Sequence, residues 1–288
     1  MSAARGAGSA RAGEGDRKSL RTLDSGPQRI AAAFAASGKR AALMPYLMGG
    51  FPDVERSLAI GEACVRGGAD LLELGIPFSD PLADGPVIHA AATQALAGGT
   101  TVEDVLGVAA SLATHVAVIV MAYANTVLMP GAERFVERLA QAGVAGLIVP
   151  DLPYEEGEDL ARASEQVGIA LVPLIAPTTT DARLREIGKR ARGFMYVVSV
   201  TGTTGERGAG STTIAPLLAR AKASTSVPVA LGFGISSPDQ AAAAAAAGAD
   251  GVIIGSRLVR AAGEAGDSAS AVGELVAQFA TALALSIA

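Results

Sequence analysis

The chain has 288 residues, of which 50% are hydrophobic and 18% are charged. This composition allows a large core, and a single α/β barrel domain can reach about 250 residues. The formal net charge is -5, and no segment concentrates basic residues with aromatic ones, which argues against a nucleic-acid partner. The longest apolar runs are too short to span a membrane. The single cysteine, Cys64, excludes a disulfide framework and, with no recognisable secretory signal, favours a cytoplasmic protein.

Residues 1–27 differ from the rest of the sequence. They are rich in glycine, alanine, serine and scattered arginine, and they lack apolar periodicity. Such a segment cannot bury enough apolar surface to fold by itself. The sequence therefore predicts a disordered tail over residues 1–27 and a single folded domain over residues 28–288.

From residue 28 onward, short and nearly continuous apolar runs alternate with amphipathic or alanine-rich stretches. Runs of this length are typical of strands, and apolar residues on both faces are typical of parallel strands covered by helices. The predicted strands are Ala42–Met48, Asp70–Gly75, Val116–Tyr123, Gly146–Val149, Ala170–Ile175, Phe194–Ser199, Val227–Leu231 and Gly251–Ile254.

A helical stretch follows each of these runs. The predicted helices are Val54–Arg66, Val102–Leu112, Ala132–Ala142, Glu155–Val167, Asp181–Arg192, Ile214–Ala223, Pro238–Gly248, Ser256–Ala262 and a last one over about Ala271–Leu285. About eight strand–helix units favour a (β/α)8 TIM barrel over the competing open, doubly wound sheet. We expect an extra N-terminal helix, Gln28–Ser37, to close the bottom of the barrel. Asp181 is predicted to cap its helix.

Glu73 is the most informative residue, because it is a carboxylate inside an apolar predicted strand. Both faces of a barrel strand are buried, so an unpaired charge there is costly. Burial raises the pKa of a carboxyl group toward neutrality, which suits a general acid–base. The alternative is a buried ion pair, but no lysine or arginine lies inside any of the predicted strands.

The loop that follows this strand contains Asp80 and Asp84 among three prolines, Pro77, Pro81 and Pro86. Proline restricts the backbone, so the loop can hold a carboxylate over the barrel mouth, where active sites of this fold lie. From spacing alone, two turn-forming aspartates are an equal alternative. The glycine-rich segment after the sixth predicted strand, Gly202–Ser211, is compatible either with a lid or with an ordinary loop.

Glycines also follow the last two predicted strands, in Gly232–Ser237 and Gly255–Ser256. Free N–H groups at a helix start attract phosphate, and barrels often bind phosphate between these two strand exits. No cluster of metal ligands is present, and no lysine lies at a strand end for a Schiff base. The carboxylates, the glycine-rich strand exits and the candidate lid together indicate metal-free acid–base chemistry on a phosphate ester.

The run Leu72–Pro86 resembles the signature of the tryptophan synthase alpha subunit family, as do Gly232–Ser236 and Pro150–Pro153. The resemblance extends over about residues 28–288. It implies a lyase that cleaves indole-3-glycerol phosphate to indole and glyceraldehyde 3-phosphate in tryptophan biosynthesis. It also implies an α2β2 tetramer in which a pyridoxal-phosphate beta subunit receives the indole, with no cofactor in this chain.

The resemblance assigns roles to individual residues. Glu73 becomes the proton-shuttling acid–base, and Asp84 binds the indole nitrogen. The implied substrate-binding residues are Tyr46 and Met121 in the indole pocket, Tyr196 near Glu73, Thr204 and Gly205 in the lid, and Gly234, Gly255 and Ser256 at the phosphate. Two residues depart from the family pattern, Met48 where threonine is common and Phe51 where a smaller or polar residue is frequent.

Two alternatives remain beside this hypothesis. A stand-alone indole-3-glycerol phosphate lyase that releases free indole would share every catalytic residue. A non-catalytic regulatory subunit would keep only the partner surface, and the presence of Glu73 and Asp84 argues against it.

Overall fold

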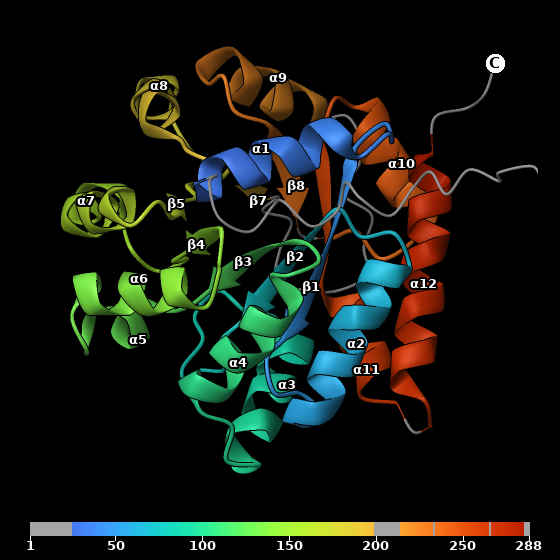
Figure 1. The fold of residues 1–288 in the computed structure, drawn as a ribbon. Coiled ribbons are helices and arrows are strands. Elements are labelled where there is room, and N and C mark those ends of the chain that lie inside the picture. The colour runs from blue at the N-terminus through green and yellow to red at the C-terminus, as the bar shows by residue number, and fades with distance from the viewer. Residues whose placement is uncertain (1–24, 199–213, 233, 265, 285–288) are drawn as a thin grey trace, which may run out of the picture.

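The computed structural model describes residues 25–198, 214–232, 234–264 and 266–284. These residues form one parallel sheet with helices around it (Figure 1). The predicted tail falls largely on residues 1–24, outside the described residues, so its extent stays a prediction. No helix in the described ranges combines the length and apolar character needed to cross a membrane.

The sheet has nine strands in the order β5-β4-β3-β2-β1-β9-β8-β7-β6, and every strand pair is parallel. The strands are β1 Ala42–Met48, β2 Leu71–Gly75, β3 Ala117–Met121, β4 Gly146–Ile148, β5 Ala170–Leu171, β6 Leu174–Ile175, β7 Met195–Val198, β8 Val229–Gly232 and β9 Gly251–Ile254.

The two edges of this sheet belong to one stretch of chain, because only Val172 and Pro173 separate β5 from β6. The Val172 N–H donates to the Leu147 carbonyl at 2.9 Å, while the Pro173 carbonyl accepts from the Tyr196 N–H at 2.9 Å. Successive residues therefore bond to strands on opposite sides, and the sheet closes on itself. Together β5 and β6 form the fifth strand of an eight-stranded barrel, so the predicted TIM-barrel fold is confirmed.

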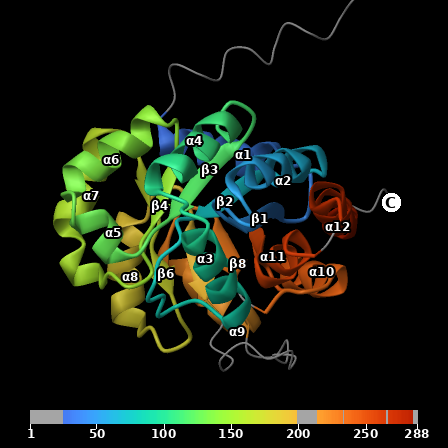
Figure 2. The same cartoon turned by 90° about the horizontal axis from the view of Figure 1, so that it is seen from below.

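The helices surround the barrel, as the view in Figure 2 makes clear. They are α1 Gly26–Ala36, α2 Val54–Arg66, α3 Pro86–Ala97, α4 Val102–Leu112, α5 Ala124–Leu128, α6 Ala132–Gln141, the 3-10 turn η1 Tyr154–Glu156, α7 Glu158–Gln166, α8 Asp181–Arg190, α9 Ile214–Ser224, α10 Pro238–Ala246, α11 Ser256–Ala262 and α12 Ser268–Leu283.

Helix α1 lies across the end of the barrel where the strands begin (Figure 1). Its Ile30 side chain is fully buried in the core, and its Arg29 guanidinium donates to the carbonyls of Gly143 and Val144 at 2.8 Å. The expectation that an extra helix closes the barrel bottom is therefore confirmed. Because α1 covers this end, the opposite end, at the carboxyl termini of the strands, remains for a site.

The structure differs from the sequence-based expectation in several elements. Helices α3 and α5 were not predicted, and the predicted helix Glu155–Val167 is divided into η1 and α7. The cap of α8 is Thr180, whose hydroxyl accepts the Arg183 N–H, so the prediction that Asp181 caps this helix is wrong. Thr180 has the extended backbone that a cap requires, whereas Asp181 already belongs to the helix.

Candidate active site

Glu73 lies in the middle of β2, directly opposite Tyr46 on β1 and Ile119 on β3. Its side chain is fully buried, and neither carboxylate oxygen has a hydrogen-bond partner among the described residues. Burial, with a smaller contribution from the charge of Asp84, raises the pKa of Glu73 to about 8. The raised pKa agrees with the burial predicted from the sequence, and it is the property that a group exchanging a proton near neutral pH requires.

Asp84 lies near the end of the β2–α3 loop, residues 76–85, and is only partly buried. Burial raises the pKa of Asp84, while a hydrogen bond from the Tyr123 hydroxyl and the proximity of His89 lower it. Asp80 is exposed, and its carboxylate accepts a hydrogen bond from Ser79. The loop thus presents Asp84, and not Asp80, to Glu73.

The two carboxylates consequently lie in different environments. Glu73 lacks any favourable partner among the described residues, whereas Asp84 has two groups that favour its charged form. Asp84 therefore ionises before Glu73. A protonated acid and a carboxylate side by side can serve two roles in one reaction.

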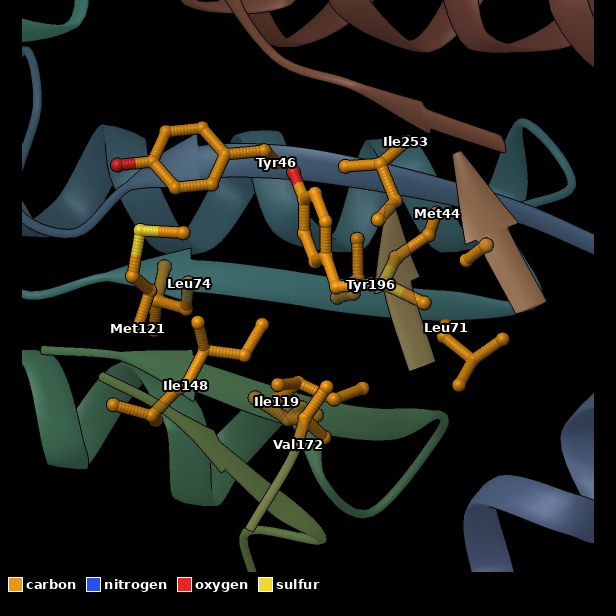
Figure 3. Close-up of a cluster of buried hydrophobic side chains, with 14 of the residues drawn as sticks. Met44, Tyr46, Leu71, Leu74, Ile119, Met121, Ile148, Val172, Tyr196 and Ile253 are labelled. Carbon is orange, nitrogen blue, oxygen red and sulfur yellow. The ribbon is translucent and has the colours of Figure 1, made fainter. Parts of the chain in front are cut away.

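Tyr46 and Tyr196 project between the strands from β1 and β7, near Met121 from β3 (Figure 3). Two glycines leave room for the phenols: the Tyr46 hydroxyl lies against Gly75, and the Tyr196 hydroxyl lies against Gly232. Burial, followed by the nearby charges of Glu73 and Asp84, raises the pKa of both phenols well above the ordinary value. Both tyrosines therefore stay neutral beside the carboxylates.

A cavity of about 1340 Å³ opens at the same end of the barrel. Asp84, Met121, Ile175 and Val198 line it at this end, and it continues along the fifth strand, past α7 and α8, to Ser25 and Pro27 at the start of α1. Glu73, Tyr46 and Tyr196 are not among its lining residues, and all three are more deeply buried than Asp84. The predicted catalytic and indole-pocket residues therefore gather at one end of the barrel, at different depths.

The three predicted phosphate residues follow β8 and β9. Gly234 has a positive φ of 78°, a conformation that favours glycine. Gly255 immediately precedes α11, and its carbonyl accepts the N–H groups of Leu258 and Val259. A side chain at position 255 would come within 3.6 Å of the Tyr46 ring, so this helix start adjoins the predicted indole pocket. Thr204 and Gly205, with the rest of the predicted lid, lie outside the described residues.

The two departures from the family pattern are both buried. Met48 ends β1, and Phe51 packs in the loop that follows it. The Phe51 ring fills the space beside Gly263, where an added β-carbon would come within 2.9 Å of it. Phe51 thus packs the β1 exit against the end of α11, and Met48 belongs to the buried core.

Tyr123 follows β3 and contacts the loop that carries Asp84, a role that was not predicted from the sequence. Its position at the end of a predicted strand was the available signal, because functional side chains of barrel enzymes gather at strand exits. Its partners Ala83 and Asp84 are distant in sequence, so no local pattern could reveal the contact.

Comparison with known proteins agrees with this arrangement. The family described as "Tryptophan synthase alpha chain" matches residues 33–286. The chain belongs to the tryptophan synthase alpha chain family. The predicted resemblance is therefore confirmed, and with it the lyase reaction that cleaves indole-3-glycerol phosphate.

Individual relatives support the same assignment. The tryptophan synthase alpha chain of Synechococcus sp. (strain CC9902) is 50% identical over 223 residues, which cover 77% of this chain and 83% of the relative. That of Methanosarcina acetivorans is 47% identical over 243 residues, covering 84% and 89%. These relatives support the alpha-chain hypothesis, and nothing in the comparisons favours a stand-alone lyase.

Solved structures give the same result for the fold. A chain of Mycobacterium tuberculosis tryptophan synthase superposes with a TM-score of 0.81 at 37% identity, covering 89% of this chain and 99% of that chain. A chain from the Pyrococcus furiosus tryptophan synthase α2β2 complex superposes with a TM-score of 0.78 at 35% identity, covering 84% and 98%.

Proposed function

We propose that this chain cleaves indole-3-glycerol phosphate with Glu73 as the acid–base and Asp84 as the carboxylate that binds the indole nitrogen. The observation that carries the proposal is the pair of carboxyl groups on β2 and the loop that follows it, one fully buried and one with groups nearby that favour its charged form. In such a site, the buried carboxyl group can transfer the proton while the ionised carboxylate stabilises positive charge on the substrate.

The reaction needs both roles because indole is a poor leaving group until its C3 carbon is protonated. Protonated Glu73 donates a proton to C3, and the Asp84 carboxylate stabilises the positive charge that develops at the ring N–H. Glu73, now a carboxylate, removes the proton from the side-chain hydroxyl next to the ring. A carbonyl forms, the carbon–carbon bond breaks, and its electrons restore the indole ring. Glu73 ends protonated, as it began.

The remaining predicted residues position the two halves of the substrate. Tyr46, Met121 and Tyr196 provide the apolar and aromatic wall against which the indole ring packs. The backbone N–H groups at Gly234, Gly255 and Ser256 bind the phosphate. The family resemblance implies that Thr204 and Gly205 belong to a lid, with Thr204 contacting Asp84 on closure.

No cofactor in this chain is needed for the proposed reaction. Glu73 supplies and recovers one proton, and the indole ring itself accepts the electron pair of the broken bond. In the proposed assembly, pyridoxal phosphate belongs to the beta subunit, which uses the indole, and the complex is cytoplasmic.

The mouth of the barrel also presents a surface for the beta subunit. Leu82 in the β2–α3 loop is 88% exposed, and Met129 at the end of α5 is 82% exposed, with Leu128 beside it at 48%. Exposed apolar side chains that gather in a patch mark interaction surfaces. We infer that these three residues contribute to docking of a beta subunit in an α2β2 tetramer.

The experiment that tests the proposed function is an assay of indole release from indole-3-glycerol phosphate by the purified wild-type chain and by Asp84→Asn. The Asn variant retains the shape of Asp84 but lacks its charge, so we expect turnover to fall at least about 100-fold while the substrate still binds. If the wild type cleaves the substrate and Asp84→Asn cleaves it at the same rate, the proposed role of Asp84 is refuted. Absence of cleavage by the wild type, alone and with a beta subunit, would refute the function.

A further inference from the structure

Tyr123 joins both ends of the β2–α3 loop to the exit of β3. Its ring stacks on Phe78 near the start of the loop, with ring centroids 5.1 Å apart and planes inclined by 21°. Its oxygen accepts the Ala83 N–H at 3.2 Å near the end of the loop. Its hydroxyl also lies near the Asp84 carboxylate and favours the charged form of that group. One buried side chain therefore contacts the loop at both ends and touches the proposed catalytic carboxylate.

Asp151 holds Tyr123 in turn. Asp151 lies in the loop after β4, and its carboxylate accepts the Ala124 N–H at 2.8 Å. Ala124 is the first residue of α5, and Tyr123 is the residue that precedes this helix. The backbone of Tyr123 is thus held from the exit of β4. This contact gives a structural role to the motif Pro150–Pro153, to which no role had been assigned from the sequence.

The three residues lie at the exits of neighbouring strands. Asp84 follows β2, Tyr123 follows β3, and Asp151 follows β4, and these strands are adjacent in the sheet. A hydrogen bond between residues at adjacent strand exits can hold a loop in one position, and the loop itself need not be longer for this. A donor that bonds the charged form of a carboxylate also favours that form.

We propose that Tyr123 is a positioning residue for the Asp84 carboxylate, and that Asp151 holds Tyr123 in the orientation this requires. The proposal rests on the proposed role of Asp84 in catalysis. Tyr123 touches no reacting atom; it acts through Asp84. The loss of its hydroxyl should leave the Asp84 carboxylate less oriented and easier to protonate.

Several other groups interact electrostatically with Asp84 or with Tyr123. Those described are Glu73 on β2, Tyr46 on β1, Tyr196 on β7, His89 on α3, and Asp151, which acts on Tyr123. None of them also holds the Ala83 N–H beside Asp84 as the Tyr123 oxygen does, so a change confined to the Tyr123 hydroxyl isolates its contribution.

The test begins with Tyr123→Phe, which keeps the ring on Phe78 and removes only the hydroxyl. The titration of Asp84 is followed by nuclear magnetic resonance of protein labelled with ¹³C in its aspartate carboxyl groups. The Asp84 signal is identified by its absence in Asp84→Asn. We expect Asp84 in Tyr123→Phe to titrate at higher pH than in the wild type. In the lyase assay, kcat/KM should fall about tenfold or more, with the acidic limb of its pH profile displaced in the same direction.

Asp151 provides the second arm. Asp151→Ala removes the acceptor of the Ala124 N–H and should displace the Asp84 titration in the same direction as Tyr123→Phe. Asp151→Asn keeps an oxygen that can accept this N–H and should restore most of what alanine loses. Tyr154→Phe is the matched control, because the Tyr154 hydroxyl donates to the Glu186 carbonyl at an exposed position. It should change neither titration nor turnover.

An unchanged Asp84 titration in both a folded Tyr123→Phe and a folded Asp151→Ala would overturn the proposal. Folding of each variant is checked by circular dichroism, and the Asp151 series decides the question if Tyr123→Phe does not fold. The titration requires no substrate. If the wild type does not cleave indole-3-glycerol phosphate, the proposed function fails, while the titration still decides whether Tyr123 positions Asp84.

Discussion

The Tyr46 hydroxyl lies against the α-carbon of Gly75, in the space that a β-carbon at position 75 would occupy. Tyr46 belongs to β1 and Gly75 ends β2, so glycine at this strand exit allows the ring to lie beside Glu73. Tyr196 and Gly232 repeat the arrangement between β7 and β8.

Gly75→Ala should therefore destabilise the protein by about 1–3 kcal/mol, the usual cost of overpacking a core. The free energy of unfolding, measured in urea, checks this. In the double variant Gly75→Ala with Tyr46→Phe, the overlapping oxygen is gone, so part of the loss should be recovered. An alanine variant as stable as the wild type would show that Tyr46 does not depend on this space.

The buried carboxyl of Glu73 should make stability depend on pH. Its pKa rises from 4.5 to about 8 on folding, so the folded state favours the protonated form. The free energy of unfolding is then highest below about pH 4.5, falls as the pH rises toward about 8, and levels off above it. At pH 8, Glu73→Gln should be more stable than the wild type by on the order of a few kcal/mol. Urea unfolding of both proteins at pH 5 and pH 8 measures this difference, and a difference that is the same at both pH values would contradict it.

The same group should limit the lyase rate in alkaline solution. Protonated Glu73 donates to the substrate, so kcat/KM should decline by about tenfold per pH unit above the pKa near 8. The pH profile of indole release by the wild type provides the test. A rate that stays constant well above pH 9 would mean that the essential acid is a different group.

Binding of the substrate phosphate can be tested at Ser256, the first residue of α11. Ser256→Asp places a negative charge where the phosphate is proposed to bind, and an acidic residue is well tolerated at a helix start. We expect KM for indole-3-glycerol phosphate to rise at least about tenfold with a smaller change in kcat. Ser256→Ala serves as the control for loss of the hydroxyl. Gly234 is a poorer choice, because its φ of 78° would strain any side chain. Equal KM values for Ser256→Asp and the alanine control would place the phosphate elsewhere.

Docking of a beta subunit can be tested at Met129, which is 82% exposed at the end of α5. Met129→Asp removes apolar surface and adds a charge, so the affinity for the beta subunit should fall at least about tenfold. The lyase rate of the isolated chain should remain unchanged. The affinity is measured by isothermal titration calorimetry, with the beta subunit titrated into each variant. Undiminished affinity would exclude Met129 from the interface.

Much of the fold could be predicted because barrel strands are short apolar runs. The bounds of β1, α2 and α4 were predicted to the residue, as were those of β9 and α11. Helix α3 was missed because it starts at Pro86, directly after the loop that carries Asp84, and its residues show little contrast between polar and apolar faces. The cap of α8 was assigned one residue too late, because Thr180 and Asp181 are both good capping residues and only the backbone distinguishes them.

The candidate site could be predicted from the sequence to a similar extent. Glu73 was identifiable because a lone carboxylate on an apolar strand needs an explanation, and the structure places it fully buried. Tyr123 was not identifiable in this way, because its hydrogen bond from Ala83 and its proximity to Asp84 depend on the pairing of β2 with β3. Sequence indicates which residues lie at strand exits, whereas the sheet order decides which of them meet.

The role of Glu73 is tested most directly by the rate of indole release from indole-3-glycerol phosphate by Glu73→Gln, compared with the wild type at neutral pH. Glutamine keeps the shape of the side chain but cannot exchange the proton, so cleavage should slow at least about 100-fold. Substrate binding, measured separately by calorimetry, should persist. A purified, folded Glu73→Gln variant that releases indole at a near-normal rate would contradict the account.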